Sequence, residues 1–353
     1  MNDLDASEVL AEADPQDFLG VVEGFPAQLR EGLAIGNSVT DLPSGDYRSV
    51  AVLGMGGSGI SGNVLELALA GGPAAVRTFR GYSLPPWVDK ETLVFAASYS
   101  GDTEETLETY RQAKDRGVHV VAVTTGGALA DLASSSGDTV VQIPAGLQPR
   151  AALGYLSVPQ IVIAEKLGLA SGAVAKLEAA AALMESRAAE YSRDVPTKDN
   201  AAKKLAGELH GMIPVVYGSE GIADVAAYRW KCQLNECAKV PAYTHVFPEL
   251  NHNEVVGWNQ LAEITTQSIA LIVLRHGNEH PRITKRIEVT LPLIQDNLGL
   301  VQEVRASGDS DLEMFFDLVY LGDFAATYLA IAQGVDPAPV EVIQDLKKRL
   351  AEG

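Results

Sequence analysis

Hydroxyl side chains gather where one apolar run of the sequence ends. The segment SYSGDTEETL, residues 98–107, follows the run 93–97 and places Ser98, Ser100 and Thr103 at the predicted carboxyl end of a sheet strand. Backbone N–H groups in the first turn of the next helix have no partner inside that helix and favour an anion. The hydroxyls add donors to these amides, so a phosphate monoester could be held here without a lysine or an arginine.

The same stretch also fits a simpler structural role, which is to cap a helix. Asp102 and Glu105 have the spacing of a capping box, in which two side chains three residues apart bond each other's backbone N–H groups. Capping accounts for these acids but not for Ser98 and Ser100. Ser58, in the turn after another predicted strand, adds a hydroxyl that faces the same crevice. The sequence therefore predicts a cap and an anion site within one segment.

A glycine-rich turn, GMGGSGISGN at residues 54–63, matches the dinucleotide-binding pattern G-x-G-x-x-G. An NAD site would need an acidic residue about twenty positions further on, and residues 70–82 contain none. Arg77 or Arg80 could serve NADP instead. A nucleotide-binding P-loop is excluded because no Gly-Lys-Ser/Thr follows. NADP binding, a structural turn and support of the hydroxyl site remain as alternatives.

Short Val-rich runs must position these turns. The runs lie at 48–54, 74–79, 92–98, 119–125 and 139–143. They alternate with helical patterns, as is typical of a parallel sheet covered by helices on both faces. We expect helices to begin near Ser58, Thr103 and Leu129, after a helical arm over about residues 6–34.

The second half of the chain repeats this pattern. Residues 170–212 predict two helices interrupted at 194–196, and a strand, turn and helix follow at 213–236. Further strands and closing helices are expected at 267–275, 299–305, about 309–333 and about 338–351, with Gly334 and the prolines near 337–339 separating the last two helices.

A chain of 353 residues fits two domains of ordinary size. We predict an α/β protein with two doubly wound domains, each a mainly parallel sheet flanked by helices. The expected division is an N-terminal helical arm over 1–35, a first domain over 36–195 and a second over 196–353. The turn at 218–221 echoes the glycine-rich turn of the first half, which suggests a duplicated domain.

Composition limits the classes of partner. The formal net charge of -19 argues against nucleic acid, whose phosphates are held mainly by lysine and arginine. Cys232 and Cys237 lie five residues apart without a second pair, so they are expected to pack rather than to bind metal. With no recognisable signal peptide, they predict a reduced, cytoplasmic protein without a disulfide. The apolar run 269–274 is too short to cross a bilayer, so no membrane partner is expected.

The segments GMGGSGISG and SYSGDTEETL together resemble the sugar isomerase (SIS) domain. The later segments LQPRAALGY, RWKCQLNECAK, PELNHNEVVGW and DPAPVEVIQDLKKRL resemble, in the same order, the bifunctional phosphoglucose/phosphomannose isomerases of that superfamily. The likeness covers nearly the whole chain after the N-terminal arm. It implies two SIS domains, a homodimer, and cofactor-independent interconversion of an aldose 6-phosphate with fructose 6-phosphate.

The resemblance also implies roles for individual residues. Glu236 would be the general base, and Arg150 would face the enediolate. His252 and Lys347 would assist ring opening, with His252 reaching the site from the partner subunit. The substrate phosphate would be held by Gly57, Ser58, Ser98, Ser100, Gly101 and Thr103.

Two positions depart from the pattern of this family. Asp102 stands where these proteins usually have asparagine, which adds a negative charge beside the phosphate and would weaken its binding. Ala338 stands where Asp-Pro-Thr-Pro is more usual, and this change bears on substrate selection.

The residue types can also be compared with the chemistry of isomerisation without using the resemblance. Isomerisation opens a sugar ring, moves a proton between adjacent carbons and stabilises an enediolate, so we expect no cofactor and no metal. The proton carrier should be a carboxylate or imidazole tuned toward neutrality by burial. Glu236 ends a predicted helix beside Leu234 and Cys237, which would bury it; the alternative is a solvated glutamate. Because the helix 222–236 is about 20 Å long, Glu236 is expected to lie far from the Gly-Ser turn of its own domain. If it acts on a sugar held by the first domain, the two domains must face each other.

His252 has the strongest local context of the six histidines, because Asn251 and Asn253 bracket it and suit an irregular loop. A metal site is not favoured, since His245 is not at a convincing ligand spacing. Arg150 could equally be an ordinary surface arginine.

Lys347 lies in the last turns of the predicted C-terminal helix, where cations complement the helix dipole in any case. Lys348 takes its place if the register slips by one residue.

The sequence therefore predicts a sugar-phosphate isomerase that acts on glucose 6-phosphate, with the sugar phosphate and a second copy of the chain as its partners. Use of mannose 6-phosphate rests on the resemblance alone. The alternative is an SIS-type protein that senses a sugar phosphate without converting it.

Overall fold

A computed structural model describes residues 1–352, and the chain divides into two compact units. The first-sheet unit comprises Gly24–Glu185 and Gly308–Phe316. The second-sheet unit comprises Met1–Glu23, Ser186–Ser307 and the chain from Asp317 onward. The predicted N-terminal arm is thus divided between the two units. The predicted boundary between the two domains remains a prediction.

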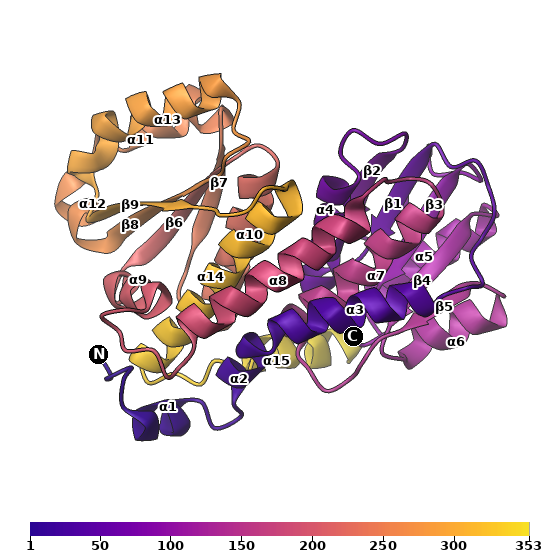
Figure 1. Ribbon diagram of the computed structural model, residues 1–353, viewed down its shortest axis with the longest axis horizontal. Coiled ribbons are helices and arrows are strands. Elements are labelled where there is room, and N and C mark those ends of the chain that lie inside the picture. Colours follow the sequence, from indigo (N-terminus) through magenta and orange to yellow (C-terminus); the bar gives the residue numbers. More distant parts are fainter. Residues whose placement is uncertain (353) are drawn as a thin grey trace. The chain divides into compact units, whose positions relative to one another are not determined.

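The first-sheet unit contains five parallel strands in the order β2-β1-β3-β4-β5 (Figure 1). All five predicted runs form strands: β1 Ser49–Leu53, β2 Ala75–Phe79, β3 Thr92–Ala97, β4 His119–Thr124 and β5 Thr139–Gln142. Every residue of β3 is buried, which explains why its sequence is a continuous apolar run rather than an alternating one.

Helices follow the strands of this unit close to where the sequence predicts them. Helices α4, α5 and α6 begin at Gly56, Glu104 and Gly127, each within two residues of the expected start. The helices of the unit and its neighbours along the chain are α3 Phe25–Ser38, α4 Gly56–Ala68, α5 Glu104–Asp115, α6 Gly127–Ser135, η1 Pro149–Ala151, α7 Leu153–Lys166 and α8 Ala173–Tyr191. The predicted N-terminal arm is broken into α1 Ser7–Ala13, α2 Phe18–Glu23 and α3.

The second-sheet unit contains four parallel strands in the order β7-β6-β8-β9. The strands are β6 Ile213–Ser219, β7 Tyr243–Phe247, β8 Ile269–Arg275 and β9 Leu300–Arg305. The sequence did not predict β7, an edge strand with mostly part-exposed side chains and so a weak apolar pattern. The order matches β2-β1-β3-β4 of the first sheet strand for strand, in agreement with the suggested duplication, and the predicted fold class is confirmed.

The remaining helices surround this sheet or lie at the chain's end. They are α9 Ala201–Leu209, α10 Ile222–Glu236, η2 Glu249–His252, α11 Glu254–Gly257, α12 Ala262–Ser268, α13 Pro281–Ile294, η3 Gln295–Asn297, α14 Asp311–Ala332 and α15 Glu341–Ala351. Helix α14 is long and apolar enough to suit a membrane span by length and composition alone. Its apolar window is wholly buried inside the protein, as in a core helix.

A buried ion pair closes the carboxyl end of the second sheet. Arg275 donates through Nε and Nη2 to the two carboxylate oxygens of Glu279, each at 2.8 Å. The backbone N–H of His276 also donates to this carboxylate, at 3.2 Å. Burial alone would raise the pKa of Glu279, but the hydrogen bonds and charge of Arg275 outweigh it and lower the pKa.

This pair should give the protein a pH-dependent part of its stability. Because the pKa of Glu279 is lower in the folded protein, its contribution is present above the unfolded pKa and is lost as the pH falls through the folded pKa. We expect Glu279→Gln to lower the free energy of unfolding by about 1.5–3 kcal/mol at pH 7. The loss should shrink below about pH 4.5, as measured by urea unfolding at several pH values.

The exposed glutamate Glu288 provides the matched control. Glu288→Gln should change the free energy of unfolding little at any pH. An equal loss at pH 7 and pH 3.5 in Glu279→Gln would contradict the linkage.

Candidate active site

In the first-sheet unit, strand pairing brings two predicted turns together. Strands β1 and β3 are parallel neighbours, so the turn that begins α4 and the loop 98–103 leave the same end of the sheet. Ser58 Oγ accepts a hydrogen bond of 3.2 Å from the backbone N–H of Tyr99, which joins the turn to the loop. Ser58 is 4% exposed and Ser98 is fully buried, so both hydroxyls lie beneath the surface at this end of the sheet.

Four hydroxyls line the join, and we call Ser58, Ser98, Ser100 and Thr103 the hydroxyl cradle. Ser98 Oγ accepts from the N–H of Gly101 at 3.1 Å and lies 2.9 Å from Thr103 Oγ1. Ser100 Oγ accepts from a backbone N–H at 3.2 Å. A hydroxyl that already accepts from the backbone keeps its own proton for donation, and a phosphate oxygen can only accept. Ser98 and Thr103 share one proton between them, and the other hydroxyl protons of the cradle are left to donate to an anion.

Two glycines, one in this loop and one in the first turn of α4, allow close approach of the backbone at the site. Gly101 has φ +77, and a Cβ there would lie 1.8 Å from the carbonyl oxygen of Gly126. A Cβ on Gly57 would lie 2.6 Å from the carbonyl oxygen of Pro149. Both predicted glycines are thus required by close backbone approach as well as by their place beside the cradle.

The predicted capping box between Asp102 and Glu105 is wrong. The N-cap of α5 is Thr103, and it makes no side-chain capping bond. Asp102 Oδ1 instead accepts from the backbone N–H of Ala128, at 3.0 Å, in the first turn of α6. The positive end of the α6 dipole attracts this carboxylate. Much of the negative charge of Asp102, which we expect from the sequence to lie beside a phosphate, is therefore directed at the N-terminus of α6.

Arg150 is 3% exposed, so the alternative of a surface arginine is wrong. It lies in η1, and its Cα would be 3.1 Å from a Cβ on Gly57. Seven of the predicted site residues are therefore brought together at one end of the first sheet: Gly57, Ser58, Ser98, Ser100, Gly101, Thr103 and Arg150.

The arginines considered for NADP have other partners. Arg77 pairs with Glu66 at 3.1 Å on the surface. Arg80 donates to the carbonyl oxygen of Gly59 at 3.1 Å and also to the side chain of Asn63. These bonds tie β2 to α4, so the glycine-rich turn has a structural use that needs no nucleotide.

In the second-sheet unit, Glu236 is the last residue of α10 and is half-buried. Its helix is fixed over the two preceding turns, where Asp323 accepts from Gln233 at 2.9 Å and from Arg229 at 2.6 and 3.1 Å. Lys239 donates to the Glu236 carbonyl oxygen and so holds the helix end as well.

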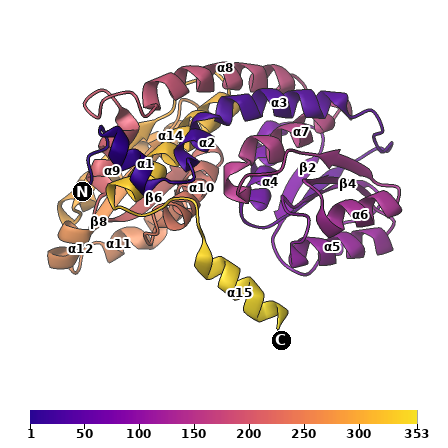
Figure 2. The same ribbon diagram turned by 90° about the horizontal axis from the view of Figure 1, so that it is seen from below.

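Glu236 lies on a pocket of about 550 Å³. The other lining residues are Asn235, Lys239, Val335, Asp336, Pro339, Val340, Glu341, Val342 and Ile343. The first turn of α15, the helix that carries Lys347, therefore shares a pocket with the predicted base. Figure 2 shows α15 extending away from the rest of its unit.

His252 ends η2 and is exposed. Asn251 Nδ2 donates to Thr290 Oγ1 at 2.8 Å, and Asn253 Nδ2 donates to Glu249 at 3.2 Å, so side-chain amides hold the segment on both sides of His252. Within residues 1–352, no group of three His, Cys, Asp or Glu side chains is arranged to hold a metal ion.

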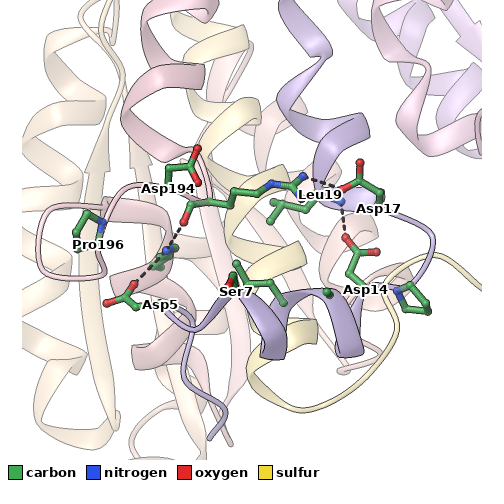
Figure 3. Close-up of a pocket in the computed structure, with 12 residues that line it drawn as sticks. Asp5, Ser7, Asp14, Asp17, Leu19, Asp194 and Pro196 are labelled. Carbon is green, nitrogen blue, oxygen red and sulfur yellow. Dashed lines mark hydrogen bonds and ion pairs between the residues drawn. The ribbon is translucent and has the colours of Figure 1, made fainter.

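Sequence reasoning missed two features of this unit. One is a set of hydrogen bonds around Glu254, which involves residues from β6 and β7 and is described below. The other is a cavity of about 480 Å³ beside the N-terminal segment (Figure 3). There Lys203 pairs with Asp5 at 3.0 Å and Arg193 pairs with Asp17 at 2.8 Å. The cations of this cavity are therefore neutralised by the protein's own acids. These ion pairs join the N-terminal segment to the rest of its unit. No local sequence signal marks these distant pairs.

Comparison with known proteins follows the same division of the chain. Residues 46–167 match the family described as "SIS domain", and residues 198–350 match the family "Bacterial phospho-glucose isomerase C-terminal SIS domain". A bifunctional phosphoglucose/phosphomannose isomerase from Caldicellulosiruptor bescii is 40% identical over 334 residues, 94% of this chain and 98% of that protein.

More distant proteins agree. A bifunctional phosphoglucose/phosphomannose isomerase from Aquifex aeolicus is 34% identical over 338 residues, 95% of this chain and 98% of that protein. Among solved structures, a glucose-6-phosphate isomerase like protein from Thermus thermophilus aligns with a TM-score of 0.62 and 20% identity, covering 99% of both chains. At that identity the structural likeness shows the fold alone.

The steric requirement at Gly101 can be tested with a matched glycine. Gly101 and Gly117 have φ of +77 and +69, but a Cβ at Gly117 would have nothing within 4 Å. We expect Gly117→Ala to cost about 1–2 kcal/mol of unfolding free energy from the backbone conformation alone. Gly101→Ala should cost more, because the backbone of Gly126 must also move.

Urea unfolding of both variants measures this difference. Equal losses for Gly101→Ala and Gly117→Ala would contradict the close approach of the two loops.

Proposed function

Because the chain belongs to the bifunctional phosphoglucose/phosphomannose isomerase family, we propose that it interconverts glucose 6-phosphate, and also mannose 6-phosphate, with fructose 6-phosphate. The observation that carries this proposal is the hydroxyl cradle, in which Ser58, Ser98 and Ser100 accept backbone N–H groups and so leave hydroxyl protons for a phosphate. A protein of net charge -19 thereby gains an anion site that does not depend on a surface cluster of basic residues.

The phosphate fixes one end of the sugar, and the reaction takes place at the other. We assign the proton transfer to Glu236. Its carboxylate removes the proton from C2 of the open-chain aldose and returns it to C1, while a hydroxyl proton moves from O2 to O1. No electrons leave the substrate, since the aldehyde carbon is reduced as its neighbour is oxidised. The guanidinium of Arg150 stabilises the negative charge that develops on the enediolate.

Ring opening needs a proton donor at the ring oxygen and an acceptor at the O1 hydroxyl, and we assign this step to His252 and Lys347. Helix α15 exposes an apolar stripe formed by Val342, Leu346 and Leu350, which are 84%, 55% and 65% exposed. At about 100° per residue, Lys347 flanks this stripe whereas Lys348 points about 160° away from its centre. A surface that covers the stripe would receive Lys347, which favours it over Lys348.

We further propose that the protein acts as a homodimer in the cytoplasm, with His252 contributed by the partner subunit. The elements around the His252 loop expose several large apolar side chains, and exposed apolar surface of this kind suits association with another chain. The exposed residues are Tyr243, Val256, Leu261, Ile264, Val289 and Leu293, all at least 50% exposed. The thiols Cys232 and Cys237 do not form a disulfide, which suits a reducing compartment.

Substitution of the proposed base and substitution of the phosphate-binding serines should change different kinetic constants. Glu236→Gln keeps the shape of the side chain but removes the base, so kcat should fall by about 10²- to 10⁴-fold with little change in KM. Ser98→Ala with Ser100→Ala removes two donors to the phosphate and should raise KM instead. A coupled assay that follows fructose 6-phosphate formation from each aldose phosphate measures both effects.

The outcomes distinguish the isomerase from a sensor. Tight binding of glucose 6-phosphate with no turnover by the wild-type protein would favour a non-catalytic sugar-phosphate sensor. An unchanged KM in the double serine variant would mean that the phosphate binds elsewhere.

The origin of His252 can be tested by subunit mixing. Glu236→Gln and His252→Ala homodimers should each be nearly inactive. If His252 acts across the interface, each mixed dimer contains one intact site, and random exchange should restore about a quarter of the wild-type activity. If His252 acts within its own chain, mixing restores none. Activity measured after unfolding and refolding the two variants together decides between these outcomes.

A further inference from the structure

A hydrogen-bonded group in the second-sheet unit has no role in the reaction described above. The carboxylate of Glu254 accepts from the Tyr217 hydroxyl and from His245 Nδ1. Trp258 Nε1 donates to the Tyr217 hydroxyl at 2.9 Å. We call these four residues the Glu254 network.

The network is anchored in the sheet. Tyr217 lies in β6, is fully buried and packs edge-on against Phe247 with ring centroids 5.9 Å apart. Burial and the neighbouring Glu254 carboxylate raise the pKa of Tyr217, so it stays a hydrogen-bond donor. His245 lies opposite Tyr217 in the paired strand β7. Glu254 is thus bonded to two adjacent strands at once.

Glu254 begins α11, two residues after His252. The residue between them, Asn253, accepts from the Glu254 backbone N–H at 2.6 Å and so ties its own position to that of Glu254. On the other side, Asn251 is bonded to Thr290 of α13. The imidazole of His252 is itself exposed, so its position depends on how these flanking residues are held.

The energy of the network argues for a geometric role. The His245 and Glu254 side chains are 29% and 31% exposed. An ion pair that solvent reaches to this extent contributes about 0–1 kcal/mol to stability. The geometry of the pair matters more than its energy, because the pair fixes the start of α11, a four-residue helix that has no buried residues of its own.

We propose that Glu254 is a positioning residue for His252, acting through its bonds to Tyr217 and His245. This inference rests on the proposed role of His252 in ring opening. Without the Glu254 carboxylate, the start of α11 loses its bonds to both strands, and the His252 loop can shift. A displacement of about 1 Å can lower a rate by on the order of 100-fold.

The test is a double-mutant cycle that uses Glu254→Ala and His252→Ala, singly and together. Glu254→Gln is a milder companion, because it keeps an acceptor for Tyr217. Glu208→Gln is the matched control, since Glu208 is an exposed glutamate on α9 of the same unit. Three quantities are measured for each variant: kcat with glucose 6-phosphate, the Kd of an open-chain five-carbon aldonic acid 5-phosphate, and the melting temperature.

We expect Glu254→Ala to lower kcat by roughly 10- to 100-fold, and Glu254→Gln by less. The Kd of the open-chain acid should stay within about threefold of wild type, because this ligand needs no ring opening. In the His252→Ala background, Glu254→Ala should have almost no further effect on kcat, since residues that act as a unit are not additive. Glu208→Gln should match the wild type.

Additive losses in the double variant, or a wild-type kcat in Glu254→Ala, would overturn the inference. Amide hydrogen exchange over residues 249–253 gives a readout that does not depend on activity. Exchange should be faster in Glu254→Ala than in Glu208→Gln, and unchanged exchange would also overturn the inference. A wild-type protein without turnover would instead refute the proposed function, while the exchange result would still decide whether Glu254 holds the loop.

Discussion

The pairing of β1 with β3 is the constraint on which the cradle depends. These parallel strands end side by side, so the turn after one and the loop after the other must share a small volume. The bond from the Tyr99 N–H to Ser58 Oγ uses that closeness, while Gly101 leaves room for the backbone of Gly126 in the loop after β4. The hydroxyls are therefore aligned by backbone geometry before any ligand arrives, which lowers the cost of ordering them around a phosphate.

The second sheet uses the same strand order for a different purpose. At its carboxyl end, Ser219 Oγ lies 2.9 Å from His276 Nε2, so the loops after β6 and β8 are again joined. Here, however, the chain supplies its own anion: the Glu279 carboxylate accepts from Arg275 and from the N–H of His276. We infer that this end of the second sheet is closed to a phosphate. In the proposed function, the first sheet thus has an anion site at this end, whereas a side chain fills the corresponding end of the second sheet.

Much of the architecture could be predicted because it follows local patterns. Buried parallel strands give continuous apolar runs, and the helices between them begin where glycine and hydroxyl residues cluster. The parallel sheets, the starts of α4, α5 and α6, and the meeting of Ser58 with the loop after β3 all follow from these signals. Edge strand β7 could not be predicted from these signals, because its part-exposed side chains give a weaker apolar pattern than those of a central strand.

The contacts that sequence reasoning missed join residues far apart in the chain. The local spacing of Asp102 and Glu105 predicts a bond within their own helix, but the Asp102 carboxylate accepts from the N–H of Ala128, 26 positions away. Glu254 bonds Tyr217 across 37 positions, and neither residue carries a local mark of the other. A short polar side chain near a helix start has several donors of similar quality within reach, and the tertiary fold decides among them. Residue types at a loop therefore predict which chemistry is possible there, whereas the direction in which each charge points depends on the packing of neighbouring elements.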